Sequence, residues 1–117
     1  MSYRYTSEIA MRQADIPAFL KGLQGTVLEA PEQERHGEVV VLSWFNLRGW
    51  PGHDDHRVEQ AFASLFAAEG DYDFVRFGDE PDDVVHAQSG YFVLHPAFVT
   101  GEENGWPTYR LTLGANP

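Results

Sequence analysis

The chain contains no cysteine and only one lysine, Lys21, among its 117 residues. The missing cysteine excludes disulfides, thiolate chemistry and cysteine-bound zinc. A chain without disulfides does not depend on an oxidising compartment, so we expect a cytoplasmic protein. No stretch approaches the roughly 20 apolar residues of a membrane helix, and the first residues lack the apolar core of a signal peptide. We therefore expect a soluble protein without a membrane partner.

Catalytic signatures are also missing. No nucleophile elbow surrounds a serine, and no glycine-rich loop is present that could cradle a phosphate. The five histidines leave general-base chemistry possible, but none is paired with a nearby nucleophile in the sequence. These absences favour a binding protein over an enzyme, and we predict no cofactor.

The composition is that of a folded protein, because 43% of the residues are hydrophobic and 14% are aromatic. The length fits a single α+β domain over residues 1–117. The net charge is −10, and ten of the acidic residues lie in 59–117, where only Arg76 and Arg110 oppose them. Such a charge repels nucleic acid and attracts basic surfaces. We therefore expect a basic protein surface as partner, and no direct binding of nucleic acid.

Hydrophobic periodicity predicts the secondary structure. Helices are predicted from Asp15, as the N-cap, to Gly25 and from Asp54 or Asp55 to Gly70. Segments 31–37 and 78–90 are polar and predict loops. Strands are predicted over 3–12, 26–29, 38–48, 72–77, 91–99 and 108–113. This order predicts a ferredoxin-like β-α-β-β-α-β fold with an added C-terminal hairpin and with helices on one face of a mostly antiparallel sheet.

The acidic stretch is the first candidate site. It lacks the alternating ligands and distal glutamate of a calcium loop, so a calcium site is not expected. We predict that it binds a basic partner; the alternative is a solvated loop, which is what most charge runs are. The predicted partner-binding acids are Glu69, Asp71, Asp73, Asp79, Glu80, Asp82 and Asp83.

Tryptophans form the second candidate site. Trp44 and Phe45 are adjacent in a predicted strand and must point to opposite faces, so one of them belongs to the core. Trp50 and Trp106 each precede a proline in a predicted loop. Exposed tryptophan is enriched in binding hot spots, so we assign both to the partner-binding site. The alternative is that these rings seal the ends of the sheet.

The sequence His53-Asp54-Asp55-His56 comes nearest to a metal site. Its residue types could bind a divalent ion, with further ligands from His36, His86 or His95. However, the spacing matches no established ligand pattern, and the two aspartates are well placed to cap a helix. We therefore predict no metal site, with His53 and His56 as the residues to test.

The chain resembles small proteins of phages and mobile elements in four features. These are the short predicted fold, the net charge of −10, the acidic segment Gly78–Asp83 and the lack of catalytic motifs. That group of proteins includes anti-CRISPR and anti-restriction inhibitors. The resemblance implies a protein that blocks the basic groove of a host nucleic-acid-processing complex. Two alternatives stay open: a small-ligand or metal-dependent domain or enzyme near His53 and His56, and a homodimeric structural or assembly protein.

Overall fold

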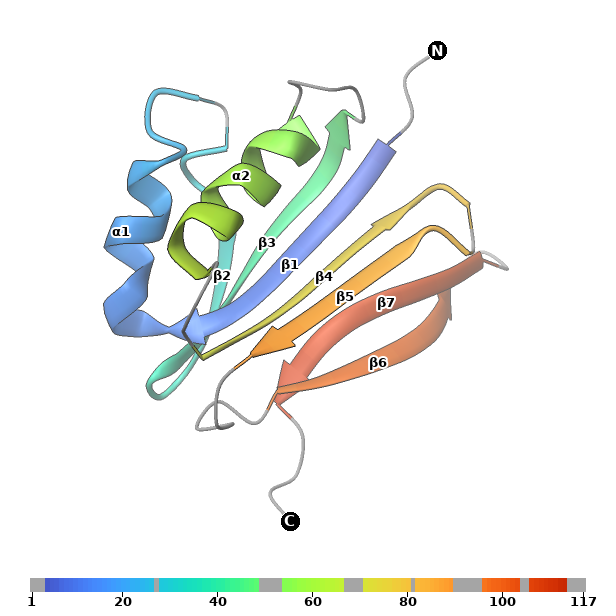
Figure 1. Cartoon of the computed structure of the whole chain (residues 1–117). Coiled ribbons are helices and arrows are strands. Elements are labelled where there is room, and N and C mark those ends of the chain that lie inside the picture. Colours follow the sequence, from blue (N-terminus) through green and yellow to red (C-terminus); the bar gives the residue numbers. More distant parts are fainter. Residues whose placement is uncertain are drawn as a thin grey trace.

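The structure is a computed structural model that describes residues 4–26, 28–48, 54–66, 71–80, 82–89, 96–103 and 106–113. Within these residues the chain is a small α+β protein, with a mostly antiparallel sheet and two short helices (Figure 1). The elements in chain order are β1 (Arg4–Arg12), the 3₁₀ turn η1 (Gln13–Asp15), α1 (Ile16–Lys21), β2 (Glu32–His36), β3 (Val39–Arg48), α2 (Asp54–Phe66), β4 (Tyr72–Gly78), β5 (Val84–Ser89), β6 (Pro96–Glu103) and β7 (Trp106–Leu113).

Five strands form one sheet in the order β2-β3-β1-β4-β5, and each neighbouring pair is antiparallel. The pairing of β1 with β3 is irregular between Tyr5, which lies opposite Leu47, and Ser7, which lies opposite Trp44. Asn46 has a φ of 58°, which lies in the left-handed region, and this local distortion is typical of a β-bulge. β6 and β7 form a separate antiparallel hairpin.

Both helices lie on one face of the sheet (Figure 1). Pro17 lies in the first turn of α1, where its missing N–H is not needed. Asp15 occupies the N-cap position, but its side chain makes no capping hydrogen bond, so that part of the prediction was wrong. Neither helix, within the described residues, has the length and apolar character needed to cross a bilayer. The core on this side consists of Ile9, Met11, Ile16, Phe19, Leu23, Leu28, Val40, Leu42, Trp44, Leu47, Val58 and Phe74.

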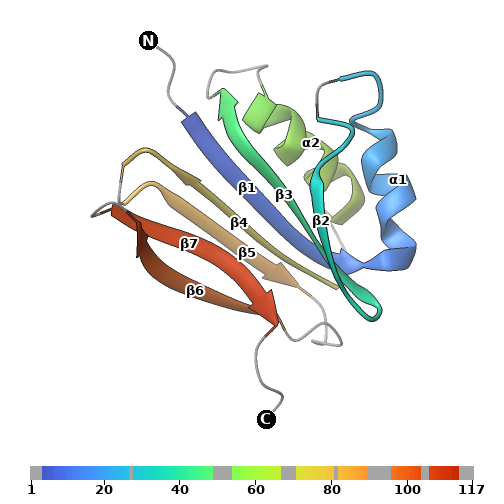
Figure 2. The same cartoon turned by 180° about the vertical axis from the view of Figure 1, so that it is seen from behind.

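The β6–β7 hairpin packs against the opposite face of the sheet (Figure 2). Because side chains alternate along a strand, neighbours of the helix-side residues point toward the hairpin. Leu111 of β7 is buried there, and the rings of Phe98 and Tyr109 stack 5.6 Å apart beside it. This second, smaller core contains Ala10, Val39, Val41, Val75 and Leu111. The homodimer alternative relied on an uncovered sheet face, and the hairpin already covers part of that face.

The segment before β3 differs from the prediction. The strand expected at 26–29 is not formed, because Thr26 and 28–30 make turns and bends. The loop expected at 31–37 instead contains β2, which pairs with β3 through a tight turn at Gly37. The φ of Gly37 is +70°, which few other residues adopt without strain. α1 is also shorter than predicted, since it ends at Lys21 and not near Gly25.

The second half of the chain contains one strand more than predicted. Residues 78–90, expected to be irregular, include β5, which pairs with β4 along its length. The strand expected at 91–99 starts outside the described residues, and β6 continues through Glu103, beyond the predicted end at 99. The predictions for β1, β3, β4 and β7 are confirmed, with ends that shift by at most two residues. α2 is confirmed over Asp54–Phe66, and its predicted end at Gly70 lies outside the described residues.

Candidate functional site

An acidic loop joins β4 to β5. We define it as Asp79, Glu80, Asp82 and Asp83, of which the first three are exposed. The backbone of the loop is closed by two hydrogen bonds: the Gly78 N–H donates to the Asp83 carbonyl at 2.9 Å, and the Asp83 N–H donates to the Glu80 carbonyl at 3.1 Å. These bonds make the loop a defined turn that holds its carboxylates at one end of the sheet.

The structure separates the acidic loop from the other predicted acids. Asp71 and Asp73 lie at the opposite end of β4, and a strand of this length spans about 20 Å. Asp71 pairs with Arg12 and accepts a hydrogen bond from its Nε at 2.9 Å. This bond to Asp71 raises the pKa of Arg12. Asp73 is buried, so its carboxylate is not part of the surface. Glu69 lies outside the described residues.

Arg76, the nearest basic residue to the acidic loop in the sequence, pairs with an acid outside the loop. Its Nη1 pairs with Oε1 of Glu59 in α2 at 2.7 Å. Its guanidinium also lies over the ring of Tyr5, 4.7 Å from the ring centroid. Arg76 therefore links β4 of the sheet to helix α2. At the loop itself, the carboxylate of Asp79 accepts a hydrogen bond from the backbone N–H of Arg4 at 3.1 Å.

The end of the β6–β7 hairpin lies beside the acidic loop in both views (Figures 1 and 2). The rings of Phe77 and Tyr109, 5.5 Å apart, hold β4 and β7 together near this end. Glu102 of β6 is exposed, and Trp106 begins β7 at the hairpin turn. The fold thus brings the backbone of Trp106 to the acidic end of the molecule. The Trp106 side chain is not among the described side chains, and Trp50 lies outside the described residues.

The structure does not test the candidate metal ligands His53 and His56. His53 lies outside the described residues, and His56 belongs to the first turn of α2, with a side chain that is not described. Among the residues that the structure does describe, no group of three or more histidines and carboxylates lies together.

Glu8 is a buried carboxylate that the sequence analysis did not single out. It lies in the middle of β1 on the hairpin side and is 1% exposed. The Ser43 hydroxyl donates a hydrogen bond to Oε2 of Glu8 at 2.9 Å. The other oxygen, Oε1, has no hydrogen-bond partner among the described residues, and Nε of Arg110 lies 3.6 Å from it. Burial raises the pKa of Glu8, although Ser43 and Arg110 favour its charged form.

Asp73 is a second buried carboxylate under the hairpin, and it pairs with the partly exposed His86. Asp73 is 1% exposed, and its Oδ1 lies 2.5 Å from Nε2 of His86 in β5. The His86 ring stacks on Phe98 of β6 with centroids 4.5 Å apart. Burial raises the pKa of Asp73, against the hydrogen bond and charge of His86. An Asp–His pair can orient a general base, but nothing described here supplies a nucleophile next to it.

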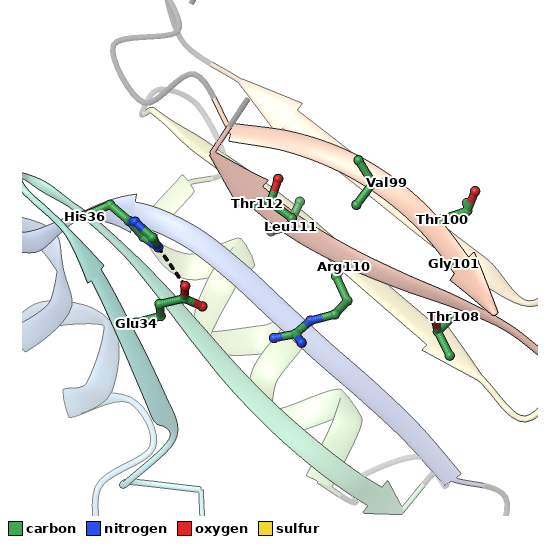
Figure 3. A pocket seen from close by; sticks show the side chains of 9 residues that line it. All are labelled: Glu34, His36, Val99, Thr100, Gly101, Thr108, Arg110, Leu111 and Thr112. Carbon is green, nitrogen blue, oxygen red and sulfur yellow. Dashed lines mark ion pairs between the residues drawn. The ribbon is translucent and has the colours of Figure 1, made fainter. Parts of the chain in front are cut away.

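A groove of about 510 Å³ lies between β2 and the hairpin (Figure 3). Glu34 and His36 point into it from β2, and Arg110 points into it from β7. His36 and Glu34 pair across 3.0 Å on one wall. Sequence reasoning missed this groove, because the residues that form it come from a strand that was predicted to be a loop and from a hairpin whose position on the sheet no sequence pattern specifies.

The chain matches no protein-family model, no curated protein and no solved structure. Its function is therefore argued from its own residues.

Proposed function

We propose that the protein is a non-enzymatic binding protein that docks on a basic protein surface through its acidic loop. The observation that carries the proposal is the loop itself: four carboxylates in five residues, most of them exposed, on a closed hairpin turn. Arg76, which could have neutralised them, is engaged by Glu59. A rigid cluster of like charges attracts an oppositely charged partner and speeds its association.

The specific role we propose is that of a phage or mobile-element inhibitor that acts in the cytoplasm. Carboxylates of the acidic loop would occupy a basic groove in place of phosphates and so block a host CRISPR or restriction complex. The net charge of −10 supports this role, because it disfavours direct binding of nucleic acid but favours the proteins that bind nucleic acid.

We also propose that the core of the fold is ferredoxin-like. The support is the order β2-β3-β1-β4 of the first four strands, with each crossover helix on the same face. This is the arrangement of two interleaved β-α-β units. β5 and the β6–β7 hairpin are then additions, and the acidic loop belongs to the part that has been added to the core.

The test compares two triple variants that lose the same charge. Asp79→Asn, Glu80→Gln and Asp82→Asn remove the three exposed charges of the acidic loop. The control carries Glu29→Gln, Glu32→Gln and Glu38→Gln, three exposed acids before and around β2, at the other edge of the sheet. Tagged proteins are incubated with lysates of bacterial hosts, retained complexes are identified, and association rates with the retained complex are measured at increasing salt.

We expect wild type and the control to retain a nucleic-acid-processing complex that salt releases. The loop variant should associate at least about tenfold more slowly, because electrostatic steering is lost. Equal rates for the two triple variants would remove the acidic loop from the mechanism. Retention that does not respond to salt would argue against a charged interface altogether.

A further inference from the structure

Arg110 is the arginine that lines the groove between β2 and β7, and its side chain is 60% exposed. Three threonines of the hairpin strands also line the groove: Thr100, Thr108 and Thr112. A Cβ at Gly101 would lie 3.3 Å from Oγ1 of Thr108, so glycine at this position leaves room for the Thr108 side chain.

Arg110 is held from below by the buried carboxylate of Glu8. The contact involves Nε of the guanidinium, 3.6 Å from Oε1 of Glu8. Among the described residues, Glu8 is the only acidic partner of Arg110, and no acid among them is paired with the two terminal nitrogens. Figure 3 shows the guanidinium in the gap between β7 and β2, over the sheet. A buried carboxylate is costly to keep, and holding an arginine in one orientation is a reason to keep it.

We propose that this groove binds a carboxylate-bearing ligand, with Arg110 as its anchor and Glu8 as the residue that positions Arg110. The planar fork of a guanidinium matches a carboxylate with two parallel hydrogen bonds. Val99 and Leu111, which also line the groove, fit the hydrocarbon part of an organic acid.

A cationic ligand fits the groove less well. Of the two acids nearest to it, Glu8 lies beneath Arg110, and Glu34 is paired with His36. The volume of about 510 Å³ lies within the range of small-molecule sites. This groove is separate from the acidic loop, so the proposed carboxylate binding does not depend on the proposed function of the loop.

The experiment uses the full chain labelled with ¹⁵N and sodium acetate as the probe, at constant ionic strength set with sodium chloride. The signals to follow are the Arg110 Nε–H and the backbone amides of Thr108 and Thr112. We expect shifts at these positions that saturate with acetate. Arg110→Lys keeps the charge but loses the fork, and should weaken binding about tenfold, the equivalent of one hydrogen bond. Arg35→Lys is the control, because Arg35 is exposed on β2 but does not line the groove.

Glu8→Gln separates positioning from charge. If Glu8 only competed for Arg110, removing its charge would tighten acetate binding; if Glu8 positions Arg110, binding should weaken. Tighter binding would overturn the positioning role of Glu8. Shifts that do not saturate, or that are unchanged in Arg110→Lys, would overturn the site. A preference for inorganic phosphate over acetate would overturn the assignment to carboxylates.

Discussion

Trp44 offers a stringent test of the helix-side core. Its ring is buried against Phe19, with centroids 5.9 Å apart, and its indole Nε1 donates to the carbonyl of Leu28 at 2.9 Å. Trp44→Phe keeps an aromatic ring but leaves that carbonyl without its donor, in a place where Leu28 is buried. A buried polar group left unsatisfied costs about 1–3 kcal/mol. The smaller ring adds roughly 1 kcal/mol for the volume that is lost.

The free energy of unfolding should therefore fall by about 2–4 kcal/mol. For a chain of this length the melting temperature should fall by about 8–16 °C. Urea unfolding followed by circular dichroism measures both the free energy and its dependence on urea. Phe45→Ala is the matched control, because the neighbouring ring is 47% exposed, and it should cost less than about 1 kcal/mol. Equal costs for the two variants would refute the assignment of Trp44 to the core and Phe45 to the surface.

Three further predictions concern charge and backbone conformation. Because burial raises the pKa of Glu8, the folded state holds this proton more tightly than the unfolded chain does. The stability of wild type relative to Glu8→Gln should therefore rise as the pH falls from the raised pKa toward the ordinary value of 4.5, which urea titrations across this range would measure. Asp71→Asn should lower the stability by about 1 kcal/mol or less, and high salt should reduce the loss, because the Arg12 side of this partly buried pair is 39% exposed to solvent. Gly37→Ala should cost about 1 kcal/mol in thermal unfolding, since the position has space for a Cβ but a φ of +70°.

The sequence predicted those elements in which apolar residues repeat with a clear period. The run Val39–Leu42 and Val58 of α2 are buried where the pattern expects them, and Phe62, one turn after Val58, packs against the same core. β2 was missed because none of its five side chains is buried, so it has no apolar pattern. Its pairing comes from the turn at Gly37 and from the strand that follows. Its charged residues also protect an edge that has no further partner in this sheet, as is usual for edge strands.

β5 was missed for a different reason. It follows directly after the acidic loop, and the charge of that segment favoured an irregular structure. Yet Val84 contacts the hairpin-side core and Ala87 the helix-side core, which is the alternation of a half-buried strand. Charge in the loop and periodicity in the strand are separate signals, and together they predict a hairpin with a charged turn.

The described acids of the predicted partner-binding set lie at the two ends of β4 and do not form one continuous surface. Seven acids between 69 and 83 look like one cluster in the sequence, but an extended strand separates its two ends and points alternate residues to opposite faces. Asp73 is carried into the protein in this way, next to His86. When a strand interrupts a run of acidic residues, the acids before and after the strand are therefore better treated as two separate candidate sites.

The burial of Glu8 and Asp73 depends on where the C-terminal hairpin packs. Glu8 and Asp73 alternate with Ile9 and Phe74, which face the helices, so the two acids occupy the opposite face. On a sheet covered by helices alone, that face would be open to water and both carboxylates would be ordinary surface groups. The β6–β7 hairpin covers them together with Val75, and its apolar contacts must offset the desolvation of two carboxylates. Arg110 belongs to this hairpin, so the element that buries Glu8 also supplies its counter-charge.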